Sequence, residues 1–247
     1  MIKFSSPPSG GSKILIISED KDYLVIEKPS GLLVHSTKYQ KENTLVDWLI
    51  ENYPEIKQID GGERPGIVHR LDQNVSGLMI IARNQKSFEY FIDQFKNSRV
   101  KKEYLALVCG RPSQEKGTIE LPIGRTKKGK LVVVQSKKNI KISKPAITEY
   151  EVVQKFPKFT LLKFRPFTGR THQIRLHSQS IGCPIVGDKQ HSKAKTDLDR
   201  IFLHAGYLGF YDLNNQWQEF KSDLPKELTN FLNKKACLSG RQGGKDE

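Results

Sequence analysis

One polar segment of the chain, residues 65–77, combines side chains that do acid–base chemistry with side chains that bind anions. Within it His69, Arg70 and Asp72 follow one another closely between two apolar stretches. A charged aspartate in such a loop can serve a reaction directly, as a base or as a nucleophile. It can equally stabilise a turn by accepting backbone hydrogen bonds and pairing with the arginine. Taken alone, the segment favours the structural turn.

A second segment, residues 167–177, passes from an expected strand into an expected helix. Arg170 and Arg175, together with the backbone N–H groups at a helix start, suit an anion such as a phosphate or a carboxylate. The structural alternative is a capped helix whose arginines are solvated. His172 and His177 lie five residues apart, the wrong spacing for two metal ligands on one helical face, so we expect no metal site.

A third segment, residues 101–108, has the apolar content of a strand, and on it Tyr104 shares a face with apolar residues. That pattern by itself favours a tyrosine in the core. The sequence contains no Walker A loop, no Gly-x-Gly-x-x-Gly, no His-Glu-x-x-His and no Gly-x-Ser-x-Gly. Nucleotide, zinc-protease and serine-hydrolase chemistry are therefore disfavoured.

The net charge indicates what kind of partner the chain binds. Its 247 residues include 41 Lys or Arg and 27 Asp or Glu, which gives a formal net charge of +14. Such an excess favours a polyanion such as nucleic acid. Residues 124–145 hold no acidic side chain and eight basic ones, namely Arg125, Lys127, Lys128, Lys130, Lys137, Lys138, Lys141 and Lys144. A hairpin around 131–134 would present them as a phosphate-binding arm, the alternative being a solvated surface.

Composition disfavours several other classes of protein. No apolar run approaches the ~20 residues of a membrane helix, so we expect no membrane partner. The three cysteines are widely spaced and odd in number, which suits neither a disulfide framework nor a zinc site. The first residues lack the apolar stretch of a secretion signal, which predicts a cytoplasmic protein.

Apolar spacing predicts the elements that position the polar segments. Short strands are expected at 14–18, 23–27, 32–35, 67–68, 78–82 and 104–109, and hairpins at 148–156 with 159–167 and at 204–211 with 216–220. Helices are expected after the N-cap residues Thr44 and Asn84, and over 171–180 and 225–233. This is the pattern of an α+β fold. We expect a flexible leader at 1–12, one domain at 13–236 and a flexible tail at 237–247.

Taken together, the three polar segments resemble the RluA-type pseudouridine synthase family. His-Arg-Leu-Asp at 69–72, followed by Ser-Gly-Leu at 76–78, is similar to that family's hallmark. Lys-Glu-Tyr-Leu-Ala at 102–106 matches its tyrosine motif, and Thr-Gly-Arg-Thr-His-Gln-Ile-Arg-Leu-His at 168–177 matches its third motif. Weaker likeness at 25–35 and 202–205 extends the resemblance over residues 14 to 232, most of the chain. Val75 departs from the pattern, because the family usually has threonine there.

The resemblance implies a fold and an activity. The fold would be that of the RluC/RluD-like enzymes, a single catalytic domain on a mixed, mainly antiparallel bent sheet with flanking helices, here without an extra N-terminal RNA-binding domain. The activity would be the isomerisation of specific uridines in structured RNA to pseudouridine, with ribosomal RNA as the favoured target and transfer RNA as the alternative. Because this reaction is redox-neutral, it implies no cofactor, neither a metal nor a nucleotide, and we expect a monomer.

Two other classes of function compete with this interpretation. The first is a catalytically inactive RNA-binding protein of the same fold, which would tolerate loss of a catalytic residue. The second is a basic nuclease or a glycosidase, which needs clustered or paired acids that the three segments do not offer. The resemblance therefore favours the isomerase.

Roles for individual residues also follow from the resemblance. Asp72 would attack ribose C1′ or remove the C2′ proton, and Arg175 would keep its carboxylate ionised. Tyr104 would stack on the uracil and take the C5 proton, and Arg70 would fill the gap left by the flipped-out uridine. The other expected substrate-binding residues are His69, Arg170, His172, Gln173 and, from the basic segment, Lys127, Lys128 and Lys130.

Overall fold

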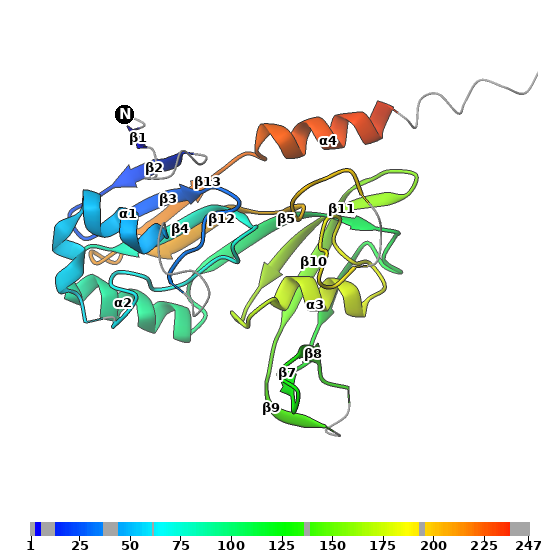
Figure 1. The fold of residues 1–247 in the computed structure, drawn as a ribbon, viewed down its shortest axis with the longest axis horizontal. Coiled ribbons are helices and arrows are strands. Elements are labelled where there is room, and N and C mark those ends of the chain that lie inside the picture. The colour runs from blue at the N-terminus through cyan, green and yellow to red at the C-terminus, as the bar shows by residue number, and fades with distance from the viewer. Residues whose placement is uncertain are drawn as a thin grey trace, which may run out of the picture. The chain divides into compact units, whose positions relative to one another are not determined.

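The computed structural model describes residues 3–5, 13–36, 44–60, 62–135, 139–192 and 196–237. The chain forms two compact units, a first unit of Met1–Lys102 with Ala205–Ser222 and a second unit of Glu103–His204 with Asp223–Glu247. The sequence predicts one domain over residues 13–236, and residues of this range belong to both units. Each combines helices with mainly antiparallel strands, so the predicted α+β class is confirmed (Figure 1).

The first unit is built on a sheet that carries the first polar segment at its centre. Its strands lie in the order β1 (Lys3–Ser5), β2 (Ile14–Glu19), β3 (Tyr23–Lys28), β4 (Ser76–Ala82) and β12 (Leu203–Tyr211), with β13 (Trp217–Lys221) paired to β12. Neighbours from β1 to β4 are antiparallel. All seven residues of β4 are buried, as its unbroken apolar run predicts. The strand β1 lies where the sequence analysis expects a flexible leader, because its backbone pairs with β2.

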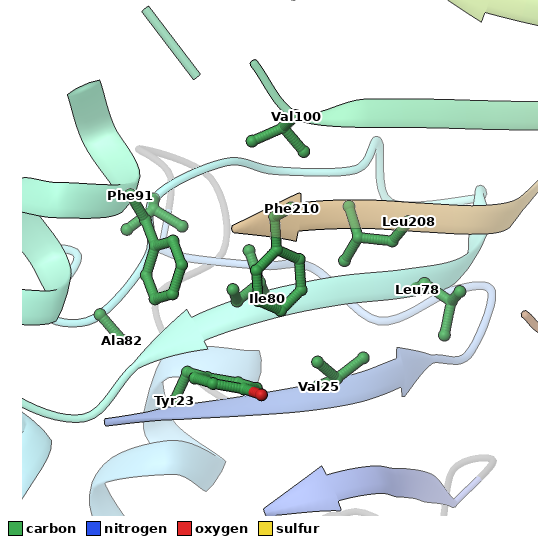
Figure 2. Packing of buried hydrophobic residues seen from close by; sticks show 10 residues of the cluster. Tyr23, Val25, Leu78, Ile80, Ala82, Phe91, Val100, Leu208 and Phe210 are labelled. Atoms are coloured by element: carbon green, nitrogen blue, oxygen red, sulfur yellow. The ribbon is translucent and has the colours of Figure 1, made fainter. Parts of the chain in front are cut away.

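Three aromatic rings form the centre of the apolar core in the first unit. Tyr23, Phe91 and Phe210 meet edge to face, with ring centroids 5.2 to 5.9 Å apart. Figure 2 shows how Leu78 and Ile80 of β4 reach into the same cluster. Aromatic pairs of this geometry contribute about 0.5–1.5 kcal/mol each beyond the area that they bury. The cluster therefore fixes β4, the strand that directly follows the polar loop at 65–75.

Both helices of the first unit begin at the N-cap residues that the sequence predicts. Thr44 and Asp47 form a reciprocal capping box at the start of α1 (Leu45–Asn52). Asn84 and Ser87 do the same at the start of α2 (Gln85–Lys96). Such caps stabilise a helix by about 1 kcal/mol. A short 3-10 helix, η1 (Pro54–Gln58), follows α1.

The second unit contains the strand of Tyr104 and the segment of the third motif. Its strands lie in the order β5 (Lys101–Cys109, from Glu103 onward), β11 (Phe159–Pro166), β10 (Thr148–Lys155) and β6 (Lys116–Ile119), and neighbours are antiparallel. The hairpin of β10 and β11 is confirmed, and β6 was not predicted. Two helices complete the unit, α3 (Gln173–Ser180) and α4 (Lys226–Cys237). The remainder of the expected tail lies outside the described residues.

The basic segment folds into a separate three-stranded sheet. It consists of β7 (Ile123–Thr126) between β8 (Leu131–Val133) and β9 (Ile140–Lys144). We call residues 123–144 the basic arm. Ile123 of the arm packs on Ala146 and on Leu176 of α3, with Leu131 and Val133 against the same cluster. The arm is therefore attached to the helix of the third motif.

One expected strand, residues 32–35, is not a strand. Its backbone carbonyls are used elsewhere: the oxygens of Leu33 and Val34 accept hydrogen bonds from the N–H groups of Leu45 and Val46. These are donors that the first turn of α1 leaves without a partner inside the helix. The segment therefore caps the helix start and does not join a sheet.

Two further boundaries differ from the prediction. The strand expected at 67–68 is reduced to one bridge, between Ile67 and Ile81. The helix expected at 171–180 begins only at Gln173, because His172 has a left-handed backbone with φ of 56°. A left-handed residue cannot continue an α-helix towards the N-terminus.

Candidate active site

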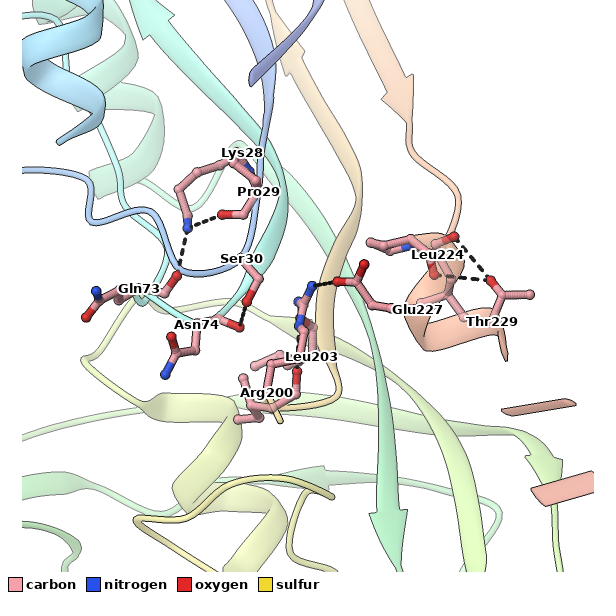
Figure 3. A network of polar contacts seen from close by, with 12 residues as sticks. Lys28, Pro29, Ser30, Gln73, Asn74, Arg200, Leu203, Leu224, Glu227 and Thr229 are labelled. Carbon is pink, nitrogen blue, oxygen red and sulfur yellow. Dashed lines mark hydrogen bonds and ion pairs between the residues drawn. The ribbon is translucent and has the colours of Figure 1, made fainter. Parts of the chain in front are cut away.

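The loop that carries Asp72 is tied to the end of β3 by a buried lysine. Lys28 is 0% exposed, and its ammonium donates hydrogen bonds to the carbonyl oxygens of Pro29 (2.7 Å), Leu32 (2.8 Å) and Gln73 (3.0 Å). Figure 3 shows two of these bonds, to Pro29 and to Gln73. A buried charge is stable only where hydrogen bonds replace its lost water, and here backbone oxygens do so. The residue after Asp72 is thereby fixed to the strand.

More hydrogen bonds join the same two stretches of chain. Gly31 and Gln73 exchange a pair, because the N–H of Gly31 donates to the Gln73 carbonyl and the Gln73 amide donates back to the Gly31 carbonyl. The hydroxyl of Ser30 donates to the carbonyl of Asn74 at 2.9 Å, also drawn in Figure 3. Asp72 itself is half-buried, and its carbonyl accepts from the N–H of Val75. These hydrogen bonds hold the backbone of the loop in place and leave Asp72 partly exposed.

His69 braces the same loop from its other side. The backbone N–H of Ile80 in β4 donates to Nε2 of His69 at 3.0 Å, and the imidazole stacks on Phe95 with ring centroids 4.5 Å apart. Because Nε2 accepts, the proton of the neutral ring must sit on Nδ1. Burial, with a smaller contribution from Lys102, lowers the pKa of His69 to about 3. Nε2 of His69 is therefore engaged in a hydrogen bond that braces the loop, and contact of His69 with substrate stays a prediction.

The end of this loop requires a glycine. Gly77 has φ of 124°, and a Cβ on it would lie 2.3 Å from the carbonyl oxygen of Ala205 in β12. No side chain fits at that distance, so the close approach of β12 at this position requires glycine. Val75, which departs from the family pattern, is 3% exposed and packs as an apolar residue.

Arg70 is exposed and points its guanidinium to a buried histidine. Its Nη1 lies 3.4 Å from Nε2 of His35, which is 7% exposed. Burial, and then the charges of Arg64 and Arg70, lower the pKa of His35 below its ordinary value.

In the second unit, Gln173 organises the turn before α3. Its Oε1 accepts from the Thr168 hydroxyl (2.7 Å) and from the N–H of Arg170 (3.0 Å). Its Nε2 donates to the Ile147 carbonyl and to the Thr148 hydroxyl, both at 2.9 Å. These four bonds use the whole capacity of the amide, and the residue is 4% exposed. The amide of Gln173 therefore holds the turn in place, and its contact with substrate stays a prediction.

Arg175 on α3 forms a two-point ion pair with Asp188. Its Nε and Nη2 donate to the two carboxylate oxygens, each at 2.8 Å, and Nη2 also donates to Oε1 of Gln190. Burial alone would raise the pKa of Asp188, which is 3% exposed, but the hydrogen bonds and charge of Arg175 and of His191 lower it overall. The plane of the guanidinium is therefore set by a buried, ionised carboxylate.

The backbone around Asp188 also depends on a close contact. Gly187 has φ of 76°, and a Cβ on it would lie 2.0 Å from the carbonyl oxygen of Arg200. The carboxylate of Asp188 in turn accepts hydrogen bonds from the N–H groups of Gln190 and His191. The segment that holds Arg175 is thus built around this glycine and this aspartate.

The remaining predicted residues of the third motif have separate surroundings. Nδ1 of His172 lies 3.1 Å from Nε2 of His191, so one ring donates a hydrogen bond to the other. Nε of Arg170 donates to the carbonyl of Pro145, next to the basic arm. His177 is fully buried, and its two ring nitrogens form hydrogen bonds with the hydroxyl of Thr148 and the carbonyl of Leu121.

Tyr104 lies on β5 opposite Phe164 of β11. The next two residues of its strand face, Ala106 and Val108, are fully buried, whereas Tyr104 is half-buried. It therefore stands where the core meets the surface and is not the fully buried core residue that its strand pattern alone favours.

The basic arm presents its charges to solvent. The described basic side chains of the arm are all exposed: Arg125, Lys127, Lys128, Lys130, Lys141 and Lys144. Lys137 and Lys138 lie outside the described residues. The apolar residues of β7 and β8 face α3 instead, so the arm has one basic and one packed side. Such a surface suits a polyanion.

The structure gathers the predicted residues within each unit. The first unit holds His69, Arg70 and Asp72 on one loop, and the second holds Tyr104, the third motif and the arm. Sequence analysis missed Lys28, His35 and Asp188, whose roles depend on partners far along the chain. In the described part of the chain, no group of three or more His, Cys, Asp or Glu residues could hold a metal ion. Among these residues there is also no helix with the length and hydropathy to span a membrane.

Comparison with protein families gives a match that covers most of the predicted site residues. Residues 22–180 match the family described as RNA pseudouridylate synthase. That range contains the loop of Asp72, the strand of Tyr104 and the third motif. The resemblance stated from the sequence is confirmed.

Curated relatives and solved structures agree with that family. The uncharacterized RNA pseudouridine synthase YlyB of Bacillus subtilis is 39% identical over 219 residues, which is 88% of this chain and 71% of the relative. A second uncharacterized RNA pseudouridine synthase, from Chloroflexus aurantiacus, is 42% identical over 81% of this chain and 63% of its own length. The ribosomal large subunit pseudouridine synthase D of Borreliella burgdorferi is 36% identical over 89% of this chain and 68% of the relative. The structure of human RNA pseudouridylate synthase domain containing 1 superposes with a TM-score of 0.71 at 26% identity, over 85% of this chain and 83% of that one.

Proposed function

Because the chain belongs to the RNA pseudouridylate synthase family, we propose that it isomerises uridines of large-subunit ribosomal RNA, with Asp72, Tyr104 and Arg175 as catalytic residues. Members of this family are isomerases. The choice of ribosomal RNA follows relatives such as the large-subunit enzyme of Borreliella burgdorferi. Transfer RNA is the alternative target.

The reaction defines what the catalytic residues must do. The bond from uracil N1 to ribose C1′ breaks, the base turns, and C5 bonds to C1′ while its proton is lost and N1 takes one up. An ionised carboxylate beside C1′ and C2′ serves this sequence, by attack at C1′ or by removal of the C2′ proton. In this proposal Asp72 is that carboxylate.

The observation that carries the proposal is the double clamp on the Asp72 loop. Lys28 donates one of its three hydrogen bonds to the carbonyl of Gln73, the residue after Asp72, and His69 accepts a hydrogen bond from the N–H of Ile80 in β4. Buried polar groups of this kind fix a backbone, and the half-buried Asp72 is the acid that the fixed loop presents. A merely structural turn would not require both clamps.

The second unit offers two further catalytic groups. Asp188 holds the guanidinium of Arg175 in one plane, which suits the stabilisation of a carboxylate or of negative charge on the substrate. The half-buried Tyr104 has a ring able to stack on uracil and a phenol able to take the C5 proton. These roles agree with the motifs on which the two residues lie.

RNA binding in this proposal uses exposed cations. Arg70 takes the space of the uridine that leaves the RNA stack, which costs a few kcal/mol unless a side chain compensates. Arg170, His172 and the lysines of the basic arm contact the RNA backbone. The exposure of every described basic side chain of the arm supports this assignment.

We further propose that the enzyme works in the cytoplasm as a monomer and without a metal or nucleotide cofactor. The supporting argument is chemical, since the isomerisation neither oxidises nor reduces the base. Activity that survives EDTA and extensive dialysis is the expected result, and dependence on an added nucleotide or metal would contradict it.

Tritium release tests the function and its target together. Transcripts of large-subunit ribosomal RNA and of transfer RNA, each labelled with tritium at uridine C5, are incubated with the purified chain, and pseudouridines are then mapped. Release from the ribosomal transcript alone is expected. Release from transfer RNA alone would overturn the target, and binding of both RNAs without release would indicate an inactive RNA-binding protein.

A further inference from the structure

His35 and Arg70 meet at the edge of the Asp72 loop, where a buried imidazole faces an exposed guanidinium. We propose that His35 is a positioning residue that directs the Arg70 side chain towards RNA, an inference that rests on the proposed role of Arg70. His35 lies seven residues after Lys28, the residue that ties the Asp72 loop to the end of β3. Its ring is 7% exposed, and its Nε2 lies 3.4 Å from Nη1 of Arg70.

The direction of this hydrogen bond fixes the state of the imidazole. A guanidinium donates and never accepts, so Nε2 of His35 is the acceptor and Nδ1 carries the proton. Among the residues that the structure describes, Nδ1 of His35 has no hydrogen-bond partner although it is buried. A buried donor left in this way is rare in folded proteins and calls for a reason. Holding Arg70 supplies that reason, because only this tautomer presents a lone pair to the arginine.

An imidazole also suits the task better than a carboxylate. A carboxylate at this position would bind Arg70 more tightly and would cancel the positive charge that the RNA must meet. The neutral ring accepts the hydrogen bond and leaves the charge intact. Burial, then Arg64 and Arg70, keep the ring neutral by lowering its pKa, and Glu63 opposes them more weakly. The lowered pKa therefore favours the neutral, accepting form of the ring at neutral pH.

Two substitutions separate the hydrogen bond from the bulk of the ring. His35→Gln keeps an acceptor near the place of Nε2, and His35→Leu keeps apolar volume without one. We expect His35→Leu to lower kcat/KM for tritium release from large-subunit ribosomal RNA roughly tenfold. His35→Gln should restore most of it. Melting temperatures of the two variants should not fall below that of the wild type, since His35→Leu removes a donor without a described partner.

A double-mutant cycle shows whether His35 acts through Arg70. In an Arg70→Ala background, His35→Leu should cause no further loss of RNA affinity, measured by filter binding of the same transcript. Additive losses would overturn the proposal, and so would a His35→Leu enzyme that matches the wild type in both affinity and turnover. A wild type that binds the transcript without releasing tritium would instead overturn the proposed function. In that case the binding cycle still decides the role of His35.

The pH dependence of binding gives a second readout that a purely structural histidine would not change. Protonation of His35 removes the acceptor and places a cation beside Arg64 and Arg70, whose charges Glu63 opposes. RNA affinity of the wild type should therefore drop as the pH falls below the ordinary histidine value of 6.5, relative to His35→Gln. Parallel curves for the two proteins would contradict the proposal.

Discussion

Asp188 accepts two parallel hydrogen bonds from Arg175, one from Nε and one from Nη2, each 2.8 Å long. The side chain of Asp188 is 1% exposed and that of Arg175 is 12% exposed, so little water competes for either group. The backbone N–H groups of Gln190 and His191 also donate to Oδ1 of this carboxylate. These contacts fix the position of the Arg175 guanidinium, although Arg175 lies on a short helix.

Replacing Asp188 by asparagine should therefore weaken both the fold and the reaction. The change leaves the Arg175 guanidinium without its buried counter-charge, which costs about 3 kcal/mol in comparable pairs. Misplacement of the arginine should lower kcat on the order of 10- to 100-fold, with RNA affinity nearly unchanged. Urea denaturation and single-turnover tritium release measure the two effects. Asp197→Asn is the matched control, because it removes an exposed carboxylate that pairs with Lys234 and Lys235.

The same ion pair predicts how stability depends on pH. The pKa of Asp188 lies lower in the folded protein than its ordinary value of 3.8, so the unfolded chain binds this proton first as the pH falls. The stabilisation is complete above 3.8 and is lost progressively below it. The difference in unfolding free energy between the wild type and Asp188→Asn should be constant from pH 5 to 7 and shrink below about pH 4. A constant difference down to pH 3 would show that Asp188 is not ionised in the fold.

Asp72→Asn should abolish turnover and leave the protein folded. Asparagine keeps the shape and the hydrogen bonds of a turn residue but supplies neither a negative charge nor a nucleophile. We expect no detectable tritium release, with melting temperature and RNA affinity close to those of the wild type. The control is Asp60→Asn, the same change at an exposed position. Release at the wild-type rate would remove Asp72 from the mechanism.

Tyr104→Phe isolates the phenol from the ring. If the ring stacks on uracil while the hydroxyl takes the C5 proton, the variant should bind RNA normally and lose most turnover. Tyr211→Phe, at an exposed tyrosine, makes the same chemical change elsewhere and should be neutral. Equal activity of both variants and the wild type would reduce Tyr104 to a packing residue.

Charge reversal on the basic arm tests its interaction with RNA. Changing Lys127, Lys128, Lys130 and Lys141 to Glu should weaken binding and flatten its salt dependence, by roughly one unit of log–log slope for each phosphate that a replaced lysine neutralises. Reversal of Lys21, Lys57, Lys86 and Lys96, which are exposed outside the arm, alters the net charge equally. If both sets act alike, the arm binds no phosphate specifically and only the overall charge attracts RNA.

Local signals explain which parts of the fold the sequence predicts. Thr44 and Asn84 were recognisable as caps because a capping box depends on residues three positions apart. The buried strand β4 was recognisable from its unbroken apolar run. The strand β9 was missed, since three of its five residues are polar or charged and its pairing partner is needed to identify it.

The sequence predicted the candidate site only where its reactive side chains lie close together along the chain. His69, Arg70 and Asp72 are adjacent, so their shared loop was expected. Asp188 gave no such signal, because its role depends on Arg175, 13 residues earlier and on a different element. The internal hydrogen bonds of His69 and Gln173 gave no signal in the sequence either, because their partners, the Ile80 N–H and the Ile147 carbonyl, lie elsewhere in the chain.

The fixed tautomer and low pKa of His69 allow opening of the Asp72 loop to be followed by NMR. An ordinary histidine exchanges its proton between two nitrogens and titrates near 6.5, whereas His69 is held in one tautomer with a pKa of about 3. In a nitrogen-15-labelled sample its two ring resonances should stay apart and unmoved across neutral pH while the loop is intact. Local opening would release Nε2 from Ile80, and the resonances would begin to titrate before the rest of the protein unfolds. The enzyme thus carries a natural probe of loop opening a few residues from Asp72.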